Sequence, residues 1–274
     1  MRDPVDSYSL SSPTVFIEEL LESDRRYFES AASVEDLSGA TLTRMPGLRS
    51  LPAACVVHRI TSSARNCSLR TWLDRLEARV ASLGYSRMRI YLQDDPPALK
   101  ALLRQRGYDS TSEIGFLKEP PQRLPSGACS FEPVSSAREW AAKLQLHQAC
   151  PMGPDGYPAP AEAWVDLEYR KTEAGYMEPF LARHDGRVCG TVSVAPATNL
   201  LRLKNIVVHP DFRGDGVGTQ LVHHVLREAR ARGYPVVGVF GVEGSPGAAL
   251  YRSCGFEAVT TQVEWQRDLS CSEA

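Results

Sequence analysis

Three glycines within five residues precede an amphipathic, arginine-rich stretch in the second half of the chain. They are Gly214, Gly216 and Gly218, in the segment HPDFRGDGVGTQLVHHVLREARARGY (209–234). Glycine is a poor helix former, so this density indicates a requirement of the backbone. The first amides of a helix have no intrahelical partner, and with the helix dipole they attract anions. We therefore predict a phosphate-binding loop at the start of a helix over 217–232.

The spacing of these glycines differs from that of two common nucleotide-binding loops. A P-loop requires Gly-x-x-x-x-Gly-Lys-Ser/Thr, and the dinucleotide fingerprint requires Gly-x-Gly-x-x-Gly. This loop has the pattern Arg213-x-x-Gly216-x-Gly218. The pattern resembles the pyrophosphate loop of the GNAT superfamily of acyl-CoA-dependent N-acyltransferases. The resemblance covers roughly residues 130–268, where NIVVHP, RGDGVGTQL, ARARGYPVV and ALYRSCGF follow one another in the family's order and spacing.

The resemblance implies that acetyl-CoA is the acyl donor and that its pyrophosphate binds at the glycine loop. The strand before the loop is expected to diverge from the next strand, so that its free backbone groups hold the pantetheine arm and the thioester carbonyl. Ser245 is expected to replace an Asn that many members carry near the tyrosine helix. The full set of expected cofactor-binding residues is Ile206, Val207, Val208, Arg213, Gly214, Asp215, Gly216, Val217, Gly218, Thr219 and Ser245.

Tyr251 occupies the position where many family members have a tyrosine that protonates the departing thiolate. A phenol with a pKa of about 10 keeps its proton at neutral pH, as this role requires. The alternative is that Tyr251 only packs in the core. The general base is open, because the strand LRLKNIVV lacks the Glu that many members carry there. Glu243, at the end of the next strand, is the first candidate, with His209 or a chain of waters as alternatives.

The acceptor is expected to bind between the first two helices of the second half and the loop CPMGPDGYPAPAEA (150–163). Tyr157, Trp164 and Tyr169 are candidate walls, although such aromatic residues more often belong to a core. Cys254 lies near a helix C-terminus, where a thiolate is not stabilised, and is expected to pack. Three arginines of the long helix are expected to form a solvated face: Arg227, Arg230 and Arg232.

The elements that position these residues are repeated along the chain. Residues 84–118 align with 233–266 with one gap: each has a Gly-Tyr helix end, a strand, a proline-started helix ending in Gly-aromatic, and another strand. We predict an α+β protein of two tandem GNAT-like domains, each a mixed, mostly antiparallel sheet flanked by helices. The predicted domains are 1–120 and 131–274, with a linker at 121–130.

The first half lacks the features that carry the chemistry. The stretch RITSSARNCSLRTW contains no glycine, and Leu103 stands at the position equivalent to Tyr251. We expect this half to be catalytically silent, to pack against the active half and to shape the acceptor groove. Two-domain GNAT members such as the mycothiol synthases resemble this arrangement, since their duplicated domains differ in competence.

Composition restricts the partners and the location of the protein. The net charge of -2 gives no support for binding to nucleic acid or to an anionic membrane. No apolar run approaches the roughly 20 residues that span a bilayer, and the first residues lack the pattern of a signal peptide. Seven cysteines without a CxxC pair, and six histidines without ligand spacing, indicate reduced thiols and no metal. We expect a cytoplasmic protein.

The function predicted from these features is acetyl transfer from acetyl-CoA to the primary amine of a small molecule, by direct attack. One alternative is acetylation of a protein lysine or N-terminus, which an open surface groove would favour. Another is a non-catalytic acyl-CoA-binding sensor or interaction module, which the missing glutamate suggests. The sequence names neither the acceptor nor the preferred acyl chain, and it leaves a homodimer open.

Overall fold

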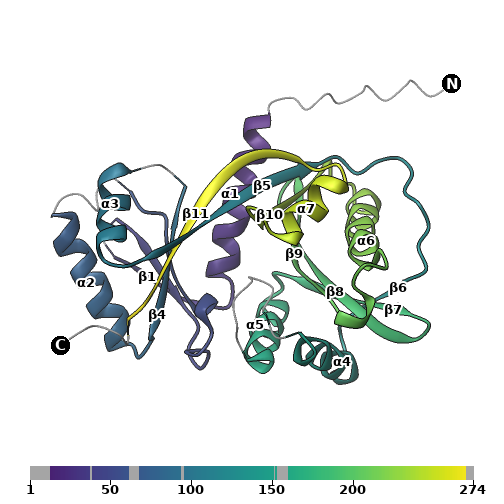
Figure 1. Ribbon diagram of the computed structural model, residues 1–274, viewed down its shortest axis with the longest axis horizontal. Coiled ribbons are helices and arrows are strands. Elements are labelled where there is room, and N and C mark those ends of the chain that lie inside the picture. Colours follow the sequence, from purple (N-terminus) through teal and green to yellow (C-terminus); the bar gives the residue numbers. More distant parts are fainter. Residues whose placement is uncertain are drawn as a thin grey trace.

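The computed structural model describes residues 13–269 except 38, 62–67, 94–95, 151 and 153–159. The described strands form one eleven-stranded sheet with helices on both faces (Figure 1). The first half contributes α1 (Pro13–Glu29), β1 (Ser33–Asp36), β2 (Thr41–Arg44), η1 (Pro52–Ala54), β3 (Cys55–His58), α2 (Leu69–Ser82), β4 (Arg87–Leu92), α3 (Pro97–Gln105) and β5 (Asp109–Lys118).

The second half contains the helix predicted after the glycine loop and the repeated strand and helix units. It contributes an additional first strand, β6, and then two helices, a three-stranded meander and the repeated strand-helix units. Its elements are β6 (Ser130–Pro133), α4 (Ala137–Gln148), α5 (Ala161–Glu173), β7 (Glu178–His184), β8 (Arg187–Pro196), β9 (Leu200–Val208), η3 (Pro210–Phe212), α6 (Val217–Ala231), β10 (Val236–Val242), α7 (Pro246–Ser253) and β11 (Glu257–Asp268).

The two halves exchange their last strands. The strand order is β1-β2-β3-β4-β11-β5-β10-β9-β8-β7-β6. β5 comes from the first half but pairs with β10 of the second, whereas β11 comes from the second half and pairs with β4 of the first. β5 and β11 also pair antiparallel with each other in the middle of the sheet. Each half therefore completes the sheet of the other, and the separation into domains at 121–130 stays a prediction.

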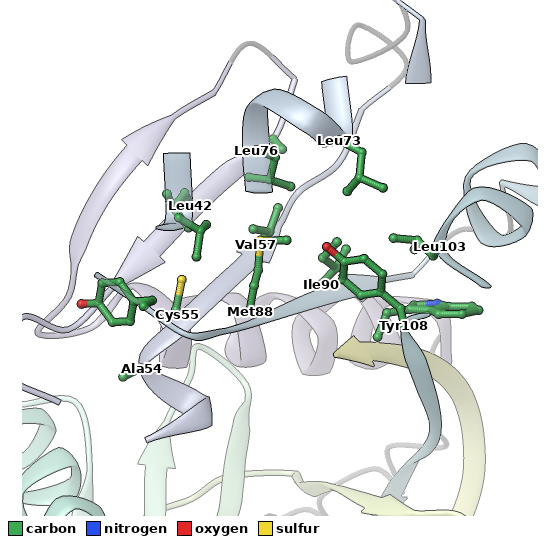
Figure 2. Packing of buried hydrophobic residues seen from close by; sticks show 14 of the residues in the cluster. Leu42, Ala54, Cys55, Val57, Leu73, Leu76, Met88, Ile90, Leu103 and Tyr108 are labelled. Carbon is green, nitrogen blue, oxygen red and sulfur yellow. The ribbon is translucent and has the colours of Figure 1, made fainter. Parts of the chain in front are cut away.

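The ends of two helices show that the halves are structural repeats. The amide of Tyr108 donates to the carbonyl of Leu103 at 3.0 Å, and the amide of Phe256 donates to the carbonyl of Tyr251 at the same distance. Leu103 and Tyr251 thus occupy equivalent positions on α3 and α7, as the alignment of the sequence predicts. Figure 2 shows Leu103 in the core of the first half, with Ile90 and Tyr108 among its neighbours in that cluster.

The helices divide between the two faces of the central sheet. Leu201 and Leu203 of β9 pack in the same cluster as α6 and α7, whereas Leu200 packs with Leu20 of α1. Because side chains alternate along a strand, α1 covers the face opposite α6 and α7. Figure 1 shows α1 crossing the middle of the sheet, at the junction between the halves. Residues of β9 and β10 on this second face therefore point toward α1.

The linker lies along α6. Arg230 donates to the carbonyl of Pro121 at 3.0 Å, and Arg227 donates to that of Pro125 at 3.3 Å. Arg232 forms an ion pair with Glu178 of β7 at 2.8 Å. Arg230 and Arg232 are exposed, as the predicted solvated face requires, and these arginines also bind the linker and the neighbouring strand. A helix face rich in arginine does not reveal by itself which carbonyls will pass over it.

Candidate active site

The three glycines of the loop satisfy two different requirements. Gly214 and Gly216 have φ angles of 92° and 76°, a region that residues with a side chain rarely adopt. A Cβ atom on Gly218 would lie 3.1 Å from the side chain of Leu250 on α7, so this glycine lets α6 and α7 pack closely. The loop conformation and the position of α6 against α7 therefore both depend on glycine.

The start of α6 presents free amide groups to solvent. Its first helical hydrogen bond runs from Gln220 N to Gly216 O at 3.1 Å. Within the described part of the chain, none of the amides from Gly214 to Thr219 donates a hydrogen bond, and the N-cap Gly216 offers no side chain. In the repeat, Ser68 caps α2 by accepting from its third residue at 3.1 Å. Of these two equivalent helix starts, that of α6 is the one without a side-chain cap, and its free amides suit an anion.

The strands that flank α6 diverge at the same end of the sheet. β9 and β10 pair in parallel only at Leu200–Arg202 with Val236–Gly238. Beyond this point β9 continues to Val208 and β10 to Val242 without pairing with each other. The backbone edge of β9 over Ile206–Val208 therefore has no strand partner on this side, although the carbonyl of Val208 accepts from the Arg213 side chain at 3.3 Å. The free amides at the start of α6 follow after η3. We call this divergence the β9–β10 splay.

A bulge in β9 lies within the splay. Thr191 of β8 pairs with Val207, but Ser193 pairs with Lys204, so β9 contains an extra residue between these pairs. Asn205 in the bulge has a φ of 54°, in the left-handed region. A bulge of this kind turns the backbone groups of the strand away from the regular ladder.

A buried polar network holds the bulge. The Asn205 side-chain amide donates to Glu168 of α5 at 3.0 Å. Glu168 forms an ion pair with Lys143 of α4 at 2.9 Å, and both side chains are fully buried. Ser193 donates to Glu168 at 3.3 Å, and Lys143 donates to Thr191 at 2.8 Å. Each charged group thus has several partners, as a buried ion pair requires. This network was not predicted from the sequence. Its one signal there is that Lys143 and Glu168 each lie on a helix face that is otherwise apolar.

Tyr251 lies on α7 beside the end of β10. Its side chain is 6% exposed, and its ring packs on Gly241, where an added Cβ would lie 3.1 Å from the ring. Its hydroxyl has no hydrogen-bond partner among the residues that the structure describes. Burial raises the pKa of Tyr251 to about 12, with Arg202 acting in the opposite direction. Tyr251 is therefore protonated at neutral pH and has a free hydroxyl.

The other residues named from the sequence have different surroundings. Glu243 is exposed in the turn after β10. Ser245 caps α7, because its hydroxyl accepts from the amide of Ala248 at 3.1 Å. The Nδ1 atom of His209 accepts from the amide of Asp211 at 3.2 Å, so this nitrogen is occupied. The roles assigned to Glu243 and Ser245 stay predictions.

Two of the aromatic residues expected to line the acceptor site, Trp164 and Tyr169, have different surroundings. Trp164 is 2% exposed and belongs to the hydrophobic core of the first half. Tyr169 is 42% exposed and packs edge-to-face on Trp140, with ring centroids 5.3 Å apart. Tyr157 lies outside the described residues. Trp164 therefore packs in a core and joins the two halves, which is the alternative to a role as a wall of the acceptor site.

A cluster of charged side chains occupies the α1 face of the splay. Asp24 of α1 accepts from Arg202 at 2.9 Å, from Lys204 at 3.1 Å and from Gln262 at 2.8 Å. Gln262 also donates to Glu113 of β5 at 2.8 Å. Sequence analysis missed this cluster, because its members come from α1, β5, β9 and β11, and only strand pairing brings them together. We call these five residues the Asp24 cluster.

The carboxyl groups of this cluster have different proton affinities. Burial by itself raises the pKa of Asp24, but the nearby Lys204 and Arg202 outweigh it and hold the pKa well below its usual value. Burial raises the pKa of Glu113 to about 7, and the charges of Asp24 and Glu264 add to the effect. Asp24 is therefore ionised at neutral pH, whereas Glu113 is poised between its two states.

The described residues contain neither a group of metal ligands nor a helix that could span a membrane. Over the residues that the structure describes, no three His, Cys, Asp or Glu side chains are grouped so that they could hold a metal ion. No helix in the same part of the chain has the length and apolar character needed to cross a membrane.

Comparison with known families agrees with this geometry. A family model described as acetyltransferase (GNAT) domain matches residues 177–258, from β7 to the start of β11. An IAA acetyltransferase of Azospirillum brasilense is 31% identical over 106 residues, which cover 37% of this chain and 67% of that protein. The mycothiol acetyltransferase of Saccharomonospora viridis is 29% identical over 206 residues, which cover 65% of this chain and 64% of that protein.

A third relative matches a shorter stretch. An uncharacterised N-acetyltransferase of Methanocaldococcus jannaschii is 32% identical over 80 residues, or 29% of this chain. The matched region spans only 35% of the length of that relative, and 64% of the length of the mycothiol acetyltransferase.

Solved structures match over almost the whole chain. A conserved protein of unknown function from Staphylococcus epidermidis aligns with a TM-score of 0.66 and 12% identity, covering 89% of this chain and 96% of that one. A tandem GNAT protein from the clavulanic acid biosynthesis pathway aligns with a TM-score of 0.59 and 16% identity, covering 93% and 89%. At these identities the likeness concerns the fold alone, and it extends to the tandem arrangement.

The uncapped helix after a bulged strand, set at the point where two parallel strands diverge, defines the acyl-CoA N-acyltransferase class of fold. The chain belongs to the GNAT acetyltransferase family.

Proposed function

We propose that this protein is an acetyl-CoA-dependent N-acetyltransferase that acetylates a primary amine of a small molecule. The observation that carries the proposal is the run of free amides from Gly214 to Thr219 at the open end of the β9–β10 splay. These donors fit a pyrophosphate, because Gly214, Asp215 and Gly216 are exposed and the helix has no side-chain cap. Acetyl-CoA supplies an acetyl group that its thioester activates.

In this proposal each part of the splay has one task. The amides of the glycine loop, with Arg213 beside them, hold the pyrophosphate. The free edge of Ile206–Val208 pairs with the pantetheine arm as a neighbouring strand would, and orients the thioester carbonyl. Tyr251 keeps its proton at neutral pH and donates it toward the departing sulfur. The amine attacks directly, so no nucleophilic residue is required.

The cover over the α1 face supports a small acceptor. Lys171 of α5 binds the end of α1, donating to the carbonyl of Ser30 at 3.0 Å and to that of Tyr27. Tyr176 donates to the carbonyl of Ser23 at 2.5 Å. α1 is thus fixed over the sheet beside the splay, which restricts access from this face. An extended peptide needs an open groove, and a small amine does not.

The first half has features that support a silent role. β3 and β4 also pair over a short stretch and then part, but Phe28 of α1 lies there, with its ring centroid 5.5 Å from that of His58 and 4.6 Å from that of Tyr91. Leu103 cannot donate a proton, and Ser68 already caps the equivalent helix. We therefore expect titration with acetyl-CoA to give one site per chain.

A thiol-release screen tests the proposal. Acetyl-, propionyl- and succinyl-CoA are each incubated with polyamines, amino acids and lysine-containing peptides. We expect release of free CoA with acetyl-CoA and a small amine, and a Tyr251→Phe variant that binds acetyl-CoA but turns over slowly. Release only with peptides would instead identify a protein acetyltransferase. Tight binding of acetyl-CoA without release for any acceptor would identify a sensor and refute the proposal.

A further inference from the structure

We propose that Glu113, on the strand that the first half lends to the second, is the general base of the acetyl transfer. The inference rests on the proposed function, and it assigns a catalytic residue to the half that lacks the glycine loop. The carboxylate removes a proton from the incoming ammonium ion on the α1 face of the splay.

The strand register places Glu113 at the open end of the splay. Glu113 of β5 lies directly opposite Val242, the last residue of β10, in an antiparallel pair. Side chains that face each other in such a pair share one face of the sheet, with Cβ atoms about 5 Å apart. Phe240 of β10 lies two residues earlier on the same face, opposite Gly115. Glu113 thus lies on the strand next to β10, beside the last residue of β10.

The exposure of the surrounding side chains indicates access at this position. Glu113, Phe240, Val242 and Lys204 are partly exposed, whereas Asp24 beside them is buried. The partly exposed side chains belong to the diverging strands and to β5. Glu113 therefore lies on the more accessible side of the Asp24 cluster.

The other carboxyl groups nearby are less suited to accept a proton. Asp24 already accepts hydrogen bonds from two cations, which stabilise its ionised form. Glu264 is buried and accepts from Tyr91. Glu243 is exposed in the turn after β10, outside the Asp24 cluster. Glu113 accepts only one hydrogen bond, from Gln262, among the described residues. Its pKa of about 7 matches the value that makes a base effective at neutral pH.

Three proton transfers accompany the acetyl transfer. Glu113 takes one proton from the ammonium ion and leaves a neutral amine with a lone pair. This nitrogen forms the C–N bond to the thioester carbonyl carbon, and the C–S bond breaks with its electron pair on sulfur. Tyr251 gives its proton to the sulfur. The second proton leaves the nitrogen as the amide forms and passes to water, and Tyr251 and Glu113 return to their initial states by exchange with solvent.

The charges around Glu113 set the direction of its pH dependence. Below pH 7 Glu113 is protonated and cannot act, so kcat rises with pH through about 7. Asp24 and Glu264 hold the pKa of Glu113 up, and Lys204 opposes them. The charged or titratable groups around the Asp24 cluster come from four elements. They are Asp24 on α1, Arg202 and Lys204 on β9, Glu264 on β11, and Arg89 and Tyr91 on β4.

The test compares Glu113→Gln with wild type and with Glu257→Gln, a matched change at an exposed position of β11. Acetyl-CoA affinity is measured by calorimetry, folding by urea denaturation, and kcat with the best amine of the screen from pH 5.5 to 9. We expect Glu113→Gln to bind acetyl-CoA normally and to lose kcat by roughly 10²–10⁴-fold, the usual contribution of a general base. The inflection near pH 7 disappears in Glu113→Gln and persists in Glu257→Gln.

A second measurement separates a base from a merely structural residue. With a weakly basic amine, which is already neutral at pH 7, no base is needed to generate the nucleophile, so the loss in Glu113→Gln shrinks. Glu113→Asp keeps the carboxylate and recovers part of kcat, together with the inflection. Full activity and an unchanged inflection in Glu113→Gln would overturn the assignment, as would loss of the inflection in Glu243→Gln alone. If the wild type releases no thiol with any amine, the proposed function itself fails.

Discussion

A charge placed at Gly216 tests the anion site most directly. Gly216 is the N-cap of α6, with a φ of 76°, and no heavy atom lies within 4 Å of an added Cβ. Gly216→Glu and Gly216→Gln therefore impose the same left-handed backbone on a residue with a side chain, which costs about 1–2 kcal/mol of stability in each. The two variants differ only in the negative charge that Glu carries.

The expected difference in affinity follows from Coulomb's law. A carboxylate about 5 Å from a pyrophosphate charge, at an effective dielectric constant between roughly 20 and 80, opposes it by about 1–3 kcal/mol. This energy corresponds to a dissociation constant for acetyl-CoA that is roughly 5–150-fold higher in Gly216→Glu than in Gly216→Gln. The gap should narrow as salt is added, because exposed charges are screened.

Isothermal titration calorimetry measures both dissociation constants, and urea denaturation shows that the two variants are equally stable. The pair of variants removes the effect of backbone strain, which a single glycine substitution cannot do. Equal affinity of the two variants for acetyl-CoA, at low salt, would show that the pyrophosphate lies elsewhere and would refute the assignment of the loop.

Three further changes test the site and the folded state. We expect Gly241→Ala to lower kcat by about 10–100-fold, because the added Cβ would lie 3.1 Å from the Tyr251 ring and displace the phenol. The affinity for acetyl-CoA should not change. An unaltered kcat would contradict the placement of Tyr251. Lys143→Met leaves the Glu168 carboxylate buried without its cation, so the free energy of unfolding, measured by urea denaturation, should fall by about 3–5 kcal/mol. A fall below about 1 kcal/mol would contradict the burial of the ion pair. Burial lowers the pKa of His224 to about 4 from 6.5, so between these values the unfolded chain binds a proton at His224 and the folded chain does not. The free energy of unfolding therefore falls as the pH drops from 6.5 to 4, and His224→Gln should reduce this fall. An equal dependence of the free energy of unfolding on pH in both proteins would refute the prediction.

Several local features of the fold could be predicted from the sequence. An Asp-Gly dipeptide between alternating apolar and polar residues predicts a hairpin turn at Asp185–Gly186, and His184 pairs with Arg187 across it. The stretch SSAREW predicts a helix with Ser135 or Ser136 as its N-cap, and Ser136 is the one that forms a capping box with Glu139. Such signals depend on a few neighbouring residues, so they do not require knowledge of what the element packs against.

The repeat could be predicted from the sequence, but the exchange of β5 and β11 between the halves could not. Two similar halves can each pair their own last strand or lend it to the other, and the pattern of residues along β5 and β11 suits both arrangements. The choice depends on the register between strands far apart in the chain, such as Glu113 opposite Val242 and Gln262. This register decides which carboxyl group stands at the splay.

The sequence by itself determined the glycine loop, the repeat and the position of Tyr251, because each is recorded in residues close together in the chain. Tertiary structure decided the rest: the free edge of β9, the network around Glu168, and the Asp24 cluster. Charged groups such as Glu113 acquire their proton affinity from burial and from neighbours on other elements, and folding alone brings these together.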